Sequence, residues 1–154
     1  VDVQSLAAGY DYIFVLSALL PATDAVALWM RIEESAAFKS GVADYYWWRQ
    51  AASFEVDASD SEIEITQSGA TTAMSNATDE VGAFEITVPN PGATVRKAII
   101  WFGGYAPPDL AGSGATQGSG SYIINTNAIT GVRFLMSSGN MASGTLMVWR
   151  RQRS

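Results

Sequence analysis

Four carboxylates lie close together in the middle of the chain, and they have the clearest potential for chemistry: Asp57, Asp60, Glu62 and Glu64. Paired carboxylates can act as acid and base on a glycosidic bond, and clustered ones can bind Ca²⁺. The spacing does not match an EF-hand loop, because no glycine stands at the turn position. Since Glu62 and Glu64 alternate with Ile63 and Ile65, we expect a strand whose acidic face is solvated.

Other catalytic groups are missing from the composition. The 154 residues include no histidine and no cysteine, so the chain cannot supply a Ser–His or Cys–His nucleophile or a disulfide. The glycine-rich segment 112–120 superficially resembles a phosphate-binding loop. It lacks the Gly-Lys-Ser/Thr ending, and a predicted strand rather than a helix follows it. We therefore expect no enzyme activity, no metal site and no cofactor.

An aromatic block at residues 45–49, with the sequence Tyr-Tyr-Trp-Trp-Arg, is the main candidate for a binding site. In a strand, Tyr45, Trp47 and Arg49 share one face, and Tyr46 and Trp48 share the other. We expect one set to join the core and the other to contact a protein or sugar, or to lie under a loop. Trp, Tyr and Arg are enriched in interface hot spots, and arginine is costly to bury alone. We therefore predict Tyr45, Trp47 and Arg49 as the contacting set.

The net charge is −6, from 15 acidic and 9 basic residues, and lysine occurs only at positions 39 and 97. This balance argues against nucleic-acid binding. Arg150, Arg151 and Arg153 cluster in the last five residues. They form either a solvated tail or a contact with an acidic neighbour, so Arg150 and Arg151 are further interface candidates. No apolar run approaches the ~20 residues that a membrane-spanning helix needs.

Apolar and polar residues alternate along much of the chain, which is typical of strands with one face on a core. The uninterrupted apolar segment 98–102 instead predicts a strand covered on both faces. Turn-forming residues separate the segments, and residues 33–39 favour a hairpin loop over a helical turn. We predict strands at 10–17, 26–33, 45–51, 62–66, 84–88, 98–102, 132–136 and 145–150.

About eight or nine short strands with regular turns predict an all-β fold, an antiparallel β-sandwich that is jelly-roll-like. The length suits a single domain over residues 1–154. Residues 106–120 are rich in Pro, Gly, Ser and Thr and predict a long flexible loop. That loop is either a simple connection or a surface element ordered against a neighbour.

Several motifs occur in an order that resembles a known family. Tyr10-Asp11-Tyr12 leads into Pro21-Ala22-Thr23-Asp24, then Leu28-Trp29-Met30-Arg31 and Asp44-Tyr45, and segments 129–134 and 138–144 resemble the family's closing hairpin. The family consists of small virion structural proteins of tailed bacteriophages, usually tail-fibre or surface-adhesin-like proteins. Residues 33–38 and the end at 149–151 depart from its pattern, and these departures concern loops and the terminus.

The resemblance implies a non-enzymatic virion structural protein on the surface or tail of the phage particle. It implies a tail-fibre or adhesin module that contacts other virion proteins and a host surface glycan or protein. The alternative is a capsid decoration, or cement, protein with a purely structural role. Self-association is implied as well, most often as a trimer. With 48% hydrophobic and only 16% charged residues, against roughly 25% charged in ordinary domains, the composition also favours exposed apolar interfaces.

Overall fold

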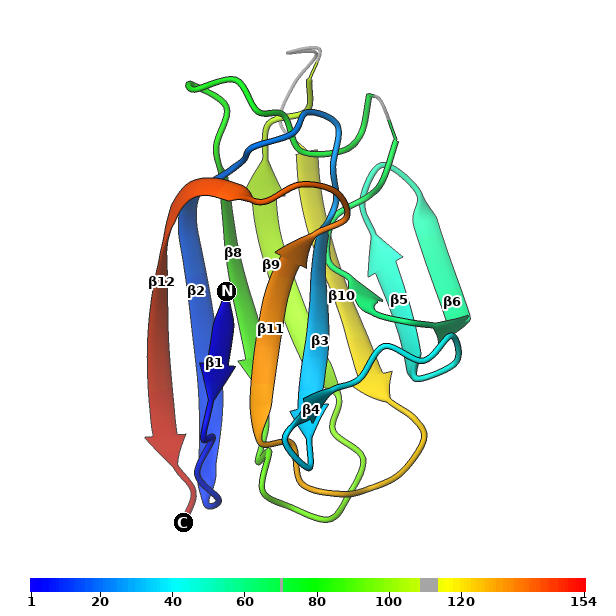
Figure 1. Cartoon of the computed structure of the whole chain (residues 1–154), viewed down its shortest axis with the longest axis vertical. Coiled ribbons are helices and arrows are strands. Elements are labelled where there is room, and N and C mark those ends of the chain that lie inside the picture. The colour runs from blue at the N-terminus through cyan, green and yellow to red at the C-terminus, as the bar shows by residue number, and fades with distance from the viewer. Residues whose placement is uncertain (70, 109–113) are drawn as a thin grey trace.

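The computed structural model describes residues 1–69, 71–108 and 114–154, which fold into two antiparallel β-sheets packed face to face (Figure 1). The predicted antiparallel sandwich is confirmed. None of the described residues lies in an α-helix. Accordingly, this part of the chain contains no helix long and apolar enough to cross a membrane.

The larger sheet has seven strands and the smaller has five. In order across the larger sheet, the strands are β12 (Met141–Gln152), β2 (Tyr10–Pro21), β8 (Gly82–Val88), β9 (Ile99–Tyr105), β10 (Gly114–Tyr122), β5 (Tyr45–Gln50) and β6 (Phe54–Asp60). The smaller sheet contains β1 (Asp2–Gln4), β11 (Gly131–Met136), β3 (Leu28–Glu34), β4 (Ala37–Phe38) and β7 (Ile63–Glu64), the last two both pairing with β3. Twelve described strands thus exceed the eight or nine that we predicted: β1 and β4 are too short to give an alternation signal, and the longer β6 and β10 were not recognised.

The core lies between the sheets and follows from alternation along each strand. In β2, Phe14 and Leu16 point inward and are buried, and Met30 and Phe134 meet them from the smaller sheet. The rings of Phe14 and Phe134 pack edge to face with centroids 5.6 Å apart. Such contacts across the two layers hold the sheets in a fixed relation, and so determine which faces remain outside.

The predicted hairpin at residues 33–39 is confirmed. Ser35 and Ala36 connect β3 to β4, and both have positive φ angles, of 52° and 60°. Two successive residues with positive φ are the signature of the tight turn whose twist matches that of antiparallel strands.

The predicted loop at 106–120 is wrong for residues 114–120, which belong to β10. Residues 109–113 of that prediction lie outside the described part of the chain. A strand rich in Gly and Ser was not recognised, because these residues usually mark turns. Here Gly118 allows close packing: a Cβ at this position would lie 2.3 Å from the Trp101 ring.

Candidate interaction surface

The aromatic block forms strand β5, and the predicted division into two faces is correct. The assignment of those faces is wrong. Tyr45, Trp47 and Arg49 point between the sheets and are 0%, 4% and 1% exposed. Tyr46 and Trp48 are on the solvent side, where the Trp48 ring stacks on Phe54 of β6 with centroids 6.2 Å apart. The contacting set that we predicted therefore belongs to the interior of the folded chain.

Arg49 is buried because neighbouring segments supply its partners. Its guanidinium contacts the Glu55 carboxylate and donates to Glu64 Oε2 at 3.1 Å and to the Thr66 carbonyl at 2.7 Å. It also lies over the Trp47 ring, 5.0 Å from the centroid. A buried charge is tolerated when it is paired and hydrogen-bonded. We predicted that Arg49 would be exposed because a buried arginine without a partner is costly, but Arg49 has its partners inside the protein.

The acidic cluster is engaged in structural contacts rather than solvated. Asp60 accepts from Trp47 Nε1 at 2.9 Å, Glu62 pairs with Arg31 at 2.9 Å, and Asp57 accepts the Ser59 amide at 2.8 Å. Burial raises the pKa of Glu64, against the lowering effect of its hydrogen bond to Arg49. Glu62 is buried, so the predicted solvated face is wrong. Among the described residues, no group of three or more acidic side chains is arranged to hold a metal ion.

The basic end of the chain forms part of β12 and pairs within the molecule. Arg151 and Arg153 donate to the two carboxylate oxygens of Asp11 in β2, at 2.8 and 2.7 Å. The hydrogen bond from Arg151 has the largest effect and the one from Arg153 the next largest, and they lower the pKa of Asp11 to about 2. Arg150 lies over the Tyr10 ring, 4.7 Å from its centroid. Two of the three arginines thus have an acidic partner inside the chain itself.

The outer face of the seven-stranded sheet is the strongest candidate surface. The register places outward-pointing residues in two rows, one from Trp149 through Ile13 and Ile100 to Val56, the other from Met147 through Val15 and Phe102 to Phe54. We call this surface the apolar face. Its apolar members are Ile13, Val15, Tyr46, Trp48, Phe54, Val56, Ile100, Phe102, Met147 and Trp149, and the same two rows also contain the polar residues Gln50, Glu85, Thr87, Gln117 and Ser119.

The prediction that residues 98–102 are covered on both faces is wrong. Ile100 and Phe102 are 52% and 59% exposed, and Trp149 is 60% exposed. Large apolar side chains that gather on one exposed sheet face mark a candidate binding site for another molecule. The sequence did contain a signal for part of the apolar face. Phe54 and Val56 in β6 are two residues apart, as are Met147 and Trp149 in β12, so each pair shares one face of its strand.

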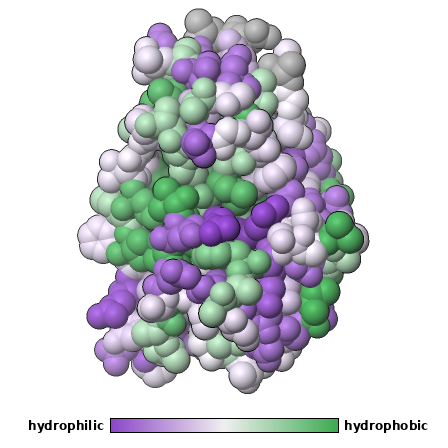
Figure 2. All heavy atoms as spheres, viewed as in Figure 1, coloured by the Kyte–Doolittle hydropathy of each residue, from purple (hydrophilic) through white to green (hydrophobic). Residues whose placement is uncertain are grey.

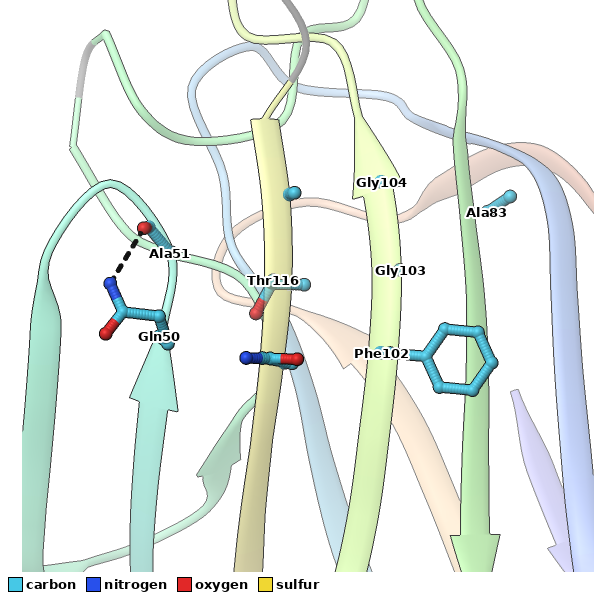
Figure 3. A pocket seen from close by; sticks show the side chains of 9 residues that line it. Gln50, Ala51, Ala83, Phe102, Gly103, Gly104 and Thr116 are labelled. Carbon is cyan, nitrogen blue, oxygen red and sulfur yellow. Dashed lines mark hydrogen bonds between the residues drawn. The ribbon is translucent and has the colours of Figure 1, made fainter.

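A shallow groove of about 520 Å³ hollows this face (Figure 3). Phe102 of β9, Gln50 of β5 and Gln117 of β10 contribute its largest side chains, and small residues such as Ala83 and Gly104 lie among its lining. None of the nine described residues that line it is charged. The groove therefore offers apolar contact and amide hydrogen bonds, but neither an acid nor a base.

The outer face of the five-stranded sheet has a different character. Arg31 and Arg133 lie opposite each other in the register, and each has its own acidic partner: Glu62 at 2.9 Å for Arg31 and Asp2 at 2.7 Å for Arg133. Figure 2 views the molecule from this side and shows hydrophilic residues crossing the middle of the face, with hydrophobic ones above and below. The charges here are matched within the chain.

Comparisons with known proteins identify no relative: no protein-family model, no curated protein and no solved structure matches this chain. A role for this chain therefore rests on its sandwich architecture, its apolar face and its paired arginines.

Proposed function

We propose that this chain is a non-enzymatic structural protein of a bacteriophage virion, acting as a tail-fibre or surface-adhesin module. The observation that carries the proposal is the apolar face, which spans the seven-stranded sheet without a covering element among the described residues. A surface of this kind suits contact with another protein. The motif order that resembles tailed-phage virion proteins supplies the biological setting.

The state of the carboxylates supports a non-enzymatic role. Glycoside chemistry needs one carboxyl as acid and a second as base or nucleophile, both facing the substrate. Glu62 and Glu64 are instead paired with Arg31 and Arg49, and Asp60 accepts a hydrogen bond from Trp47. These groups stabilise the fold where the smaller sheet meets β5 and β6.

The alternative role, capsid decoration, draws less support from the basic end of the chain. Reciprocal contacts between a basic tail and the acidic body of a neighbour would favour a cement protein. Arg151 and Arg153 already bind Asp11 of their own chain. We place the tail-fibre or adhesin role first because of the uncovered apolar face; a contact between copies through the remaining arginine, Arg150, would be compatible with either role.

Antibody labelling of phage particles tests this proposal. An antibody raised against the purified chain should decorate the tail or its fibres in electron micrographs. Label on the capsid would support the decoration role instead, and particles that contain no such protein would overturn both.

A second test uses the apolar face directly. The purified chain should bind host cells or another virion protein and should compete with phage adsorption. The double variant Phe102→Gln, Trp149→Gln should lose that binding while staying folded, because both side chains are mostly exposed. Arg96→Gln is a matched control, since Arg96 is exposed and lies outside the apolar face. Equal binding by the double variant and the wild type would exclude this face as the contact.

A further inference from the structure

The seven-stranded sheet ends in two open edges. In the described part of the chain, β12 pairs only with β2, and β6 pairs only with β5. An open edge presents unpaired backbone N–H and C=O groups that can pair with another strand. Edge strands that avoid such pairing are usually very short, carry proline or charged side chains, or contain a β-bulge. β12 has twelve residues and no proline; its register shifts lie between Met141 and Thr145, so the regular stretch from Thr145 to Gln152 carries only Arg150 and Arg151 as protective charges.

The two edges run in the same direction. Each neighbouring pair in the sheet is antiparallel, and β12 and β6 are separated by an even number of steps. When two copies lie side by side with the same orientation, the β12 edge of one therefore faces the β6 edge of the next as a parallel pair. Main-chain pairing of this kind extends a sheet across two molecules.

The charges of the two edges are opposite. β12 contains Arg150 and Arg151 and no acidic residue, whereas β6 contains Glu55, Asp57 and Asp60 and no basic residue. Opposite charges on adjacent strands stabilise a pairing, and complementary patches also steer the encounter of two molecules. Two β12 edges facing each other would bring together only basic strands.

One register matches both apolar residues and charges. With Phe54 beside Met147, Val56 falls beside Trp149 and Asp57 beside Arg150. Phe54 and Val56 point to the outer face, as Met147 and Trp149 do. Asp57 and Arg150 point to the inner face, because they lie opposite Trp47 and Tyr12. Met147 and Trp149 then meet apolar residues and Arg150 meets an acid, while Glu55, which is paired with Arg49 of its own chain, falls beside Val148.

Both charged partners in this register remain available. Arg150 lies over the Tyr10 ring and has no carboxylate partner among the described residues. Asp57 accepts the amide of Ser59 through one oxygen and forms no ion pair in that part of the chain. The two side chains can therefore pair between copies without breaking an existing ion pair.

We propose that copies of this chain associate head to tail, with the β12 edge of one copy paired to the β6 edge of the next. The partner is a second copy of the same chain. The proposal depends on the proposed function only in assuming that the chain works within an assembly. Because the two contacting surfaces differ, the association is heterologous and gives a closed ring or an open filament. The apolar faces of successive copies would form one extended surface.

Charge variants test the pairing by sedimentation velocity over a concentration series at micromolar protein. Arg150→Glu and Asp57→Arg should each raise the dissociation constant of self-association about tenfold, because attraction becomes repulsion. The double variant that carries both changes should restore it, since the pair is merely exchanged. Added salt should weaken the wild-type association.

Milder variants guard against loss of folding. Asp57→Asn keeps an oxygen for the Ser59 amide, and Arg150→Gln keeps a long side chain; both should weaken association several-fold with an unchanged circular dichroism spectrum. A monomeric wild-type protein over the whole series would overturn the proposal. So would an Asp57→Arg variant that associates like the wild type, because β6 would then play no part.

Engineered cysteines test the register, since the natural chain has none. Protein with Val56→Cys mixed with protein with Trp149→Cys should form a disulfide-linked dimer on oxidation, and neither protein alone should do so. Self-linking by the Trp149→Cys protein alone would indicate β12 pairing with β12 and overturn the proposal, as would the absence of linking in the mixture. Particle labelling reports on the proposed function separately, because self-association in solution needs no virion.

Discussion

Arg49, on the inner face of the seven-stranded sheet, is 1% exposed, whereas Trp149, on the outer face of the same sheet, is 60% exposed. The usual preferences of the two residue types are thus reversed. The inner face receives Glu55, Glu64 and the Thr66 carbonyl, which satisfy the guanidinium. No second layer is placed over the outer face within the described residues. Burial in this sheet follows the partners that other segments bring, and the uncovered face is the one free to bind.

The largest effect of substitution on stability is expected at Arg49, on the inner face. Replacement by alanine should lower the free energy of unfolding by about 3–5 kcal/mol, because it leaves buried acceptors and two carboxylates without their cation. Urea unfolding measures the change. Arg96→Ala, at an exposed arginine, is the matched control and should have little effect. Equal losses at the two positions would mean that the buried cluster contributes nothing particular.

The next largest difference is expected between the two tryptophans of β5, because Trp47 lies on the inner face and Trp48 on the outer face. Trp47→Ala should cost about 3–5 kcal/mol, because it opens a cavity in the core, and it also removes the hydrogen bond to Asp60. Trp48→Ala should cost only about 1 kcal/mol, mainly the stacking on Phe54. Thermal unfolding followed by calorimetry gives both values. If Trp48→Ala proved the more damaging, the face assignment would be reversed.

Two carboxylates should affect stability in opposite directions when the pH falls: Asp11, on the outer face of the seven-stranded sheet, and Glu64 of β7, which contacts Arg49 on its inner face. Asp11, held by Arg151 and Arg153 on the outer side, has a pKa lowered to about 2 from its ordinary 3.8. Its contribution to stability is therefore complete above the ordinary pKa and is lost as the pH falls toward 2. Burial raises the pKa of Glu64, so the folded state retains that proton and acidification through its range favours folding.

Melting temperatures measured between about pH 5 and pH 2 check this difference. Asp11→Asn should flatten the acid limb of the profile, and Glu64→Gln should not. An unchanged acid limb in Asp11→Asn would show that the arginine pairs are too weakly formed to affect folding.

The smallest effect on stability is expected on the apolar face. Phe102→Thr should change the free energy of unfolding by no more than about 0.5 kcal/mol, as is usual for surface positions. The same variant should bind a hydrophobic dye more weakly than the wild type. Ile86→Thr, on the buried side of β8, is the contrasting control and should be strongly destabilised. Comparable losses at both positions would mean that Phe102 is covered in the folded chain.

The fold class was predictable from sequence because alternation follows from strand geometry alone. Residues 84–88 and 132–136 lie in β8 and β11 as predicted. The faces of β5 were not predictable in the same way, since the partners of Arg49 come from β6, β7 and the segment beyond. Local sequence shows which residues share a face, but not what the opposite layer supplies.

The exposed surface was harder to predict than the fold. The apolar segment 98–102 was predicted to be covered on both sides, whereas Ile100 and Phe102 face solvent. The residue type alone does not show whether an apolar side chain packs in the core or lies on the surface, where it can contact a partner. Strand β10 was missed for the opposite reason, because Gly118 is required by the bulk of Trp101 rather than by a turn.

The pairing of β12 with β2 also constrains how the molecule is made. Asp11 and Arg151 are 140 residues apart in the chain, yet they lie side by side in the sheet. During synthesis, β2 leaves the ribosome long before its neighbour exists, with one edge unprotected. Sheets that depend on such distant pairings fold slowly and are exposed to aggregation meanwhile. Chains that stop before residue 141 should therefore be captured by chaperones or aggregate, even though the buried core residues, which end at Met136, are all present.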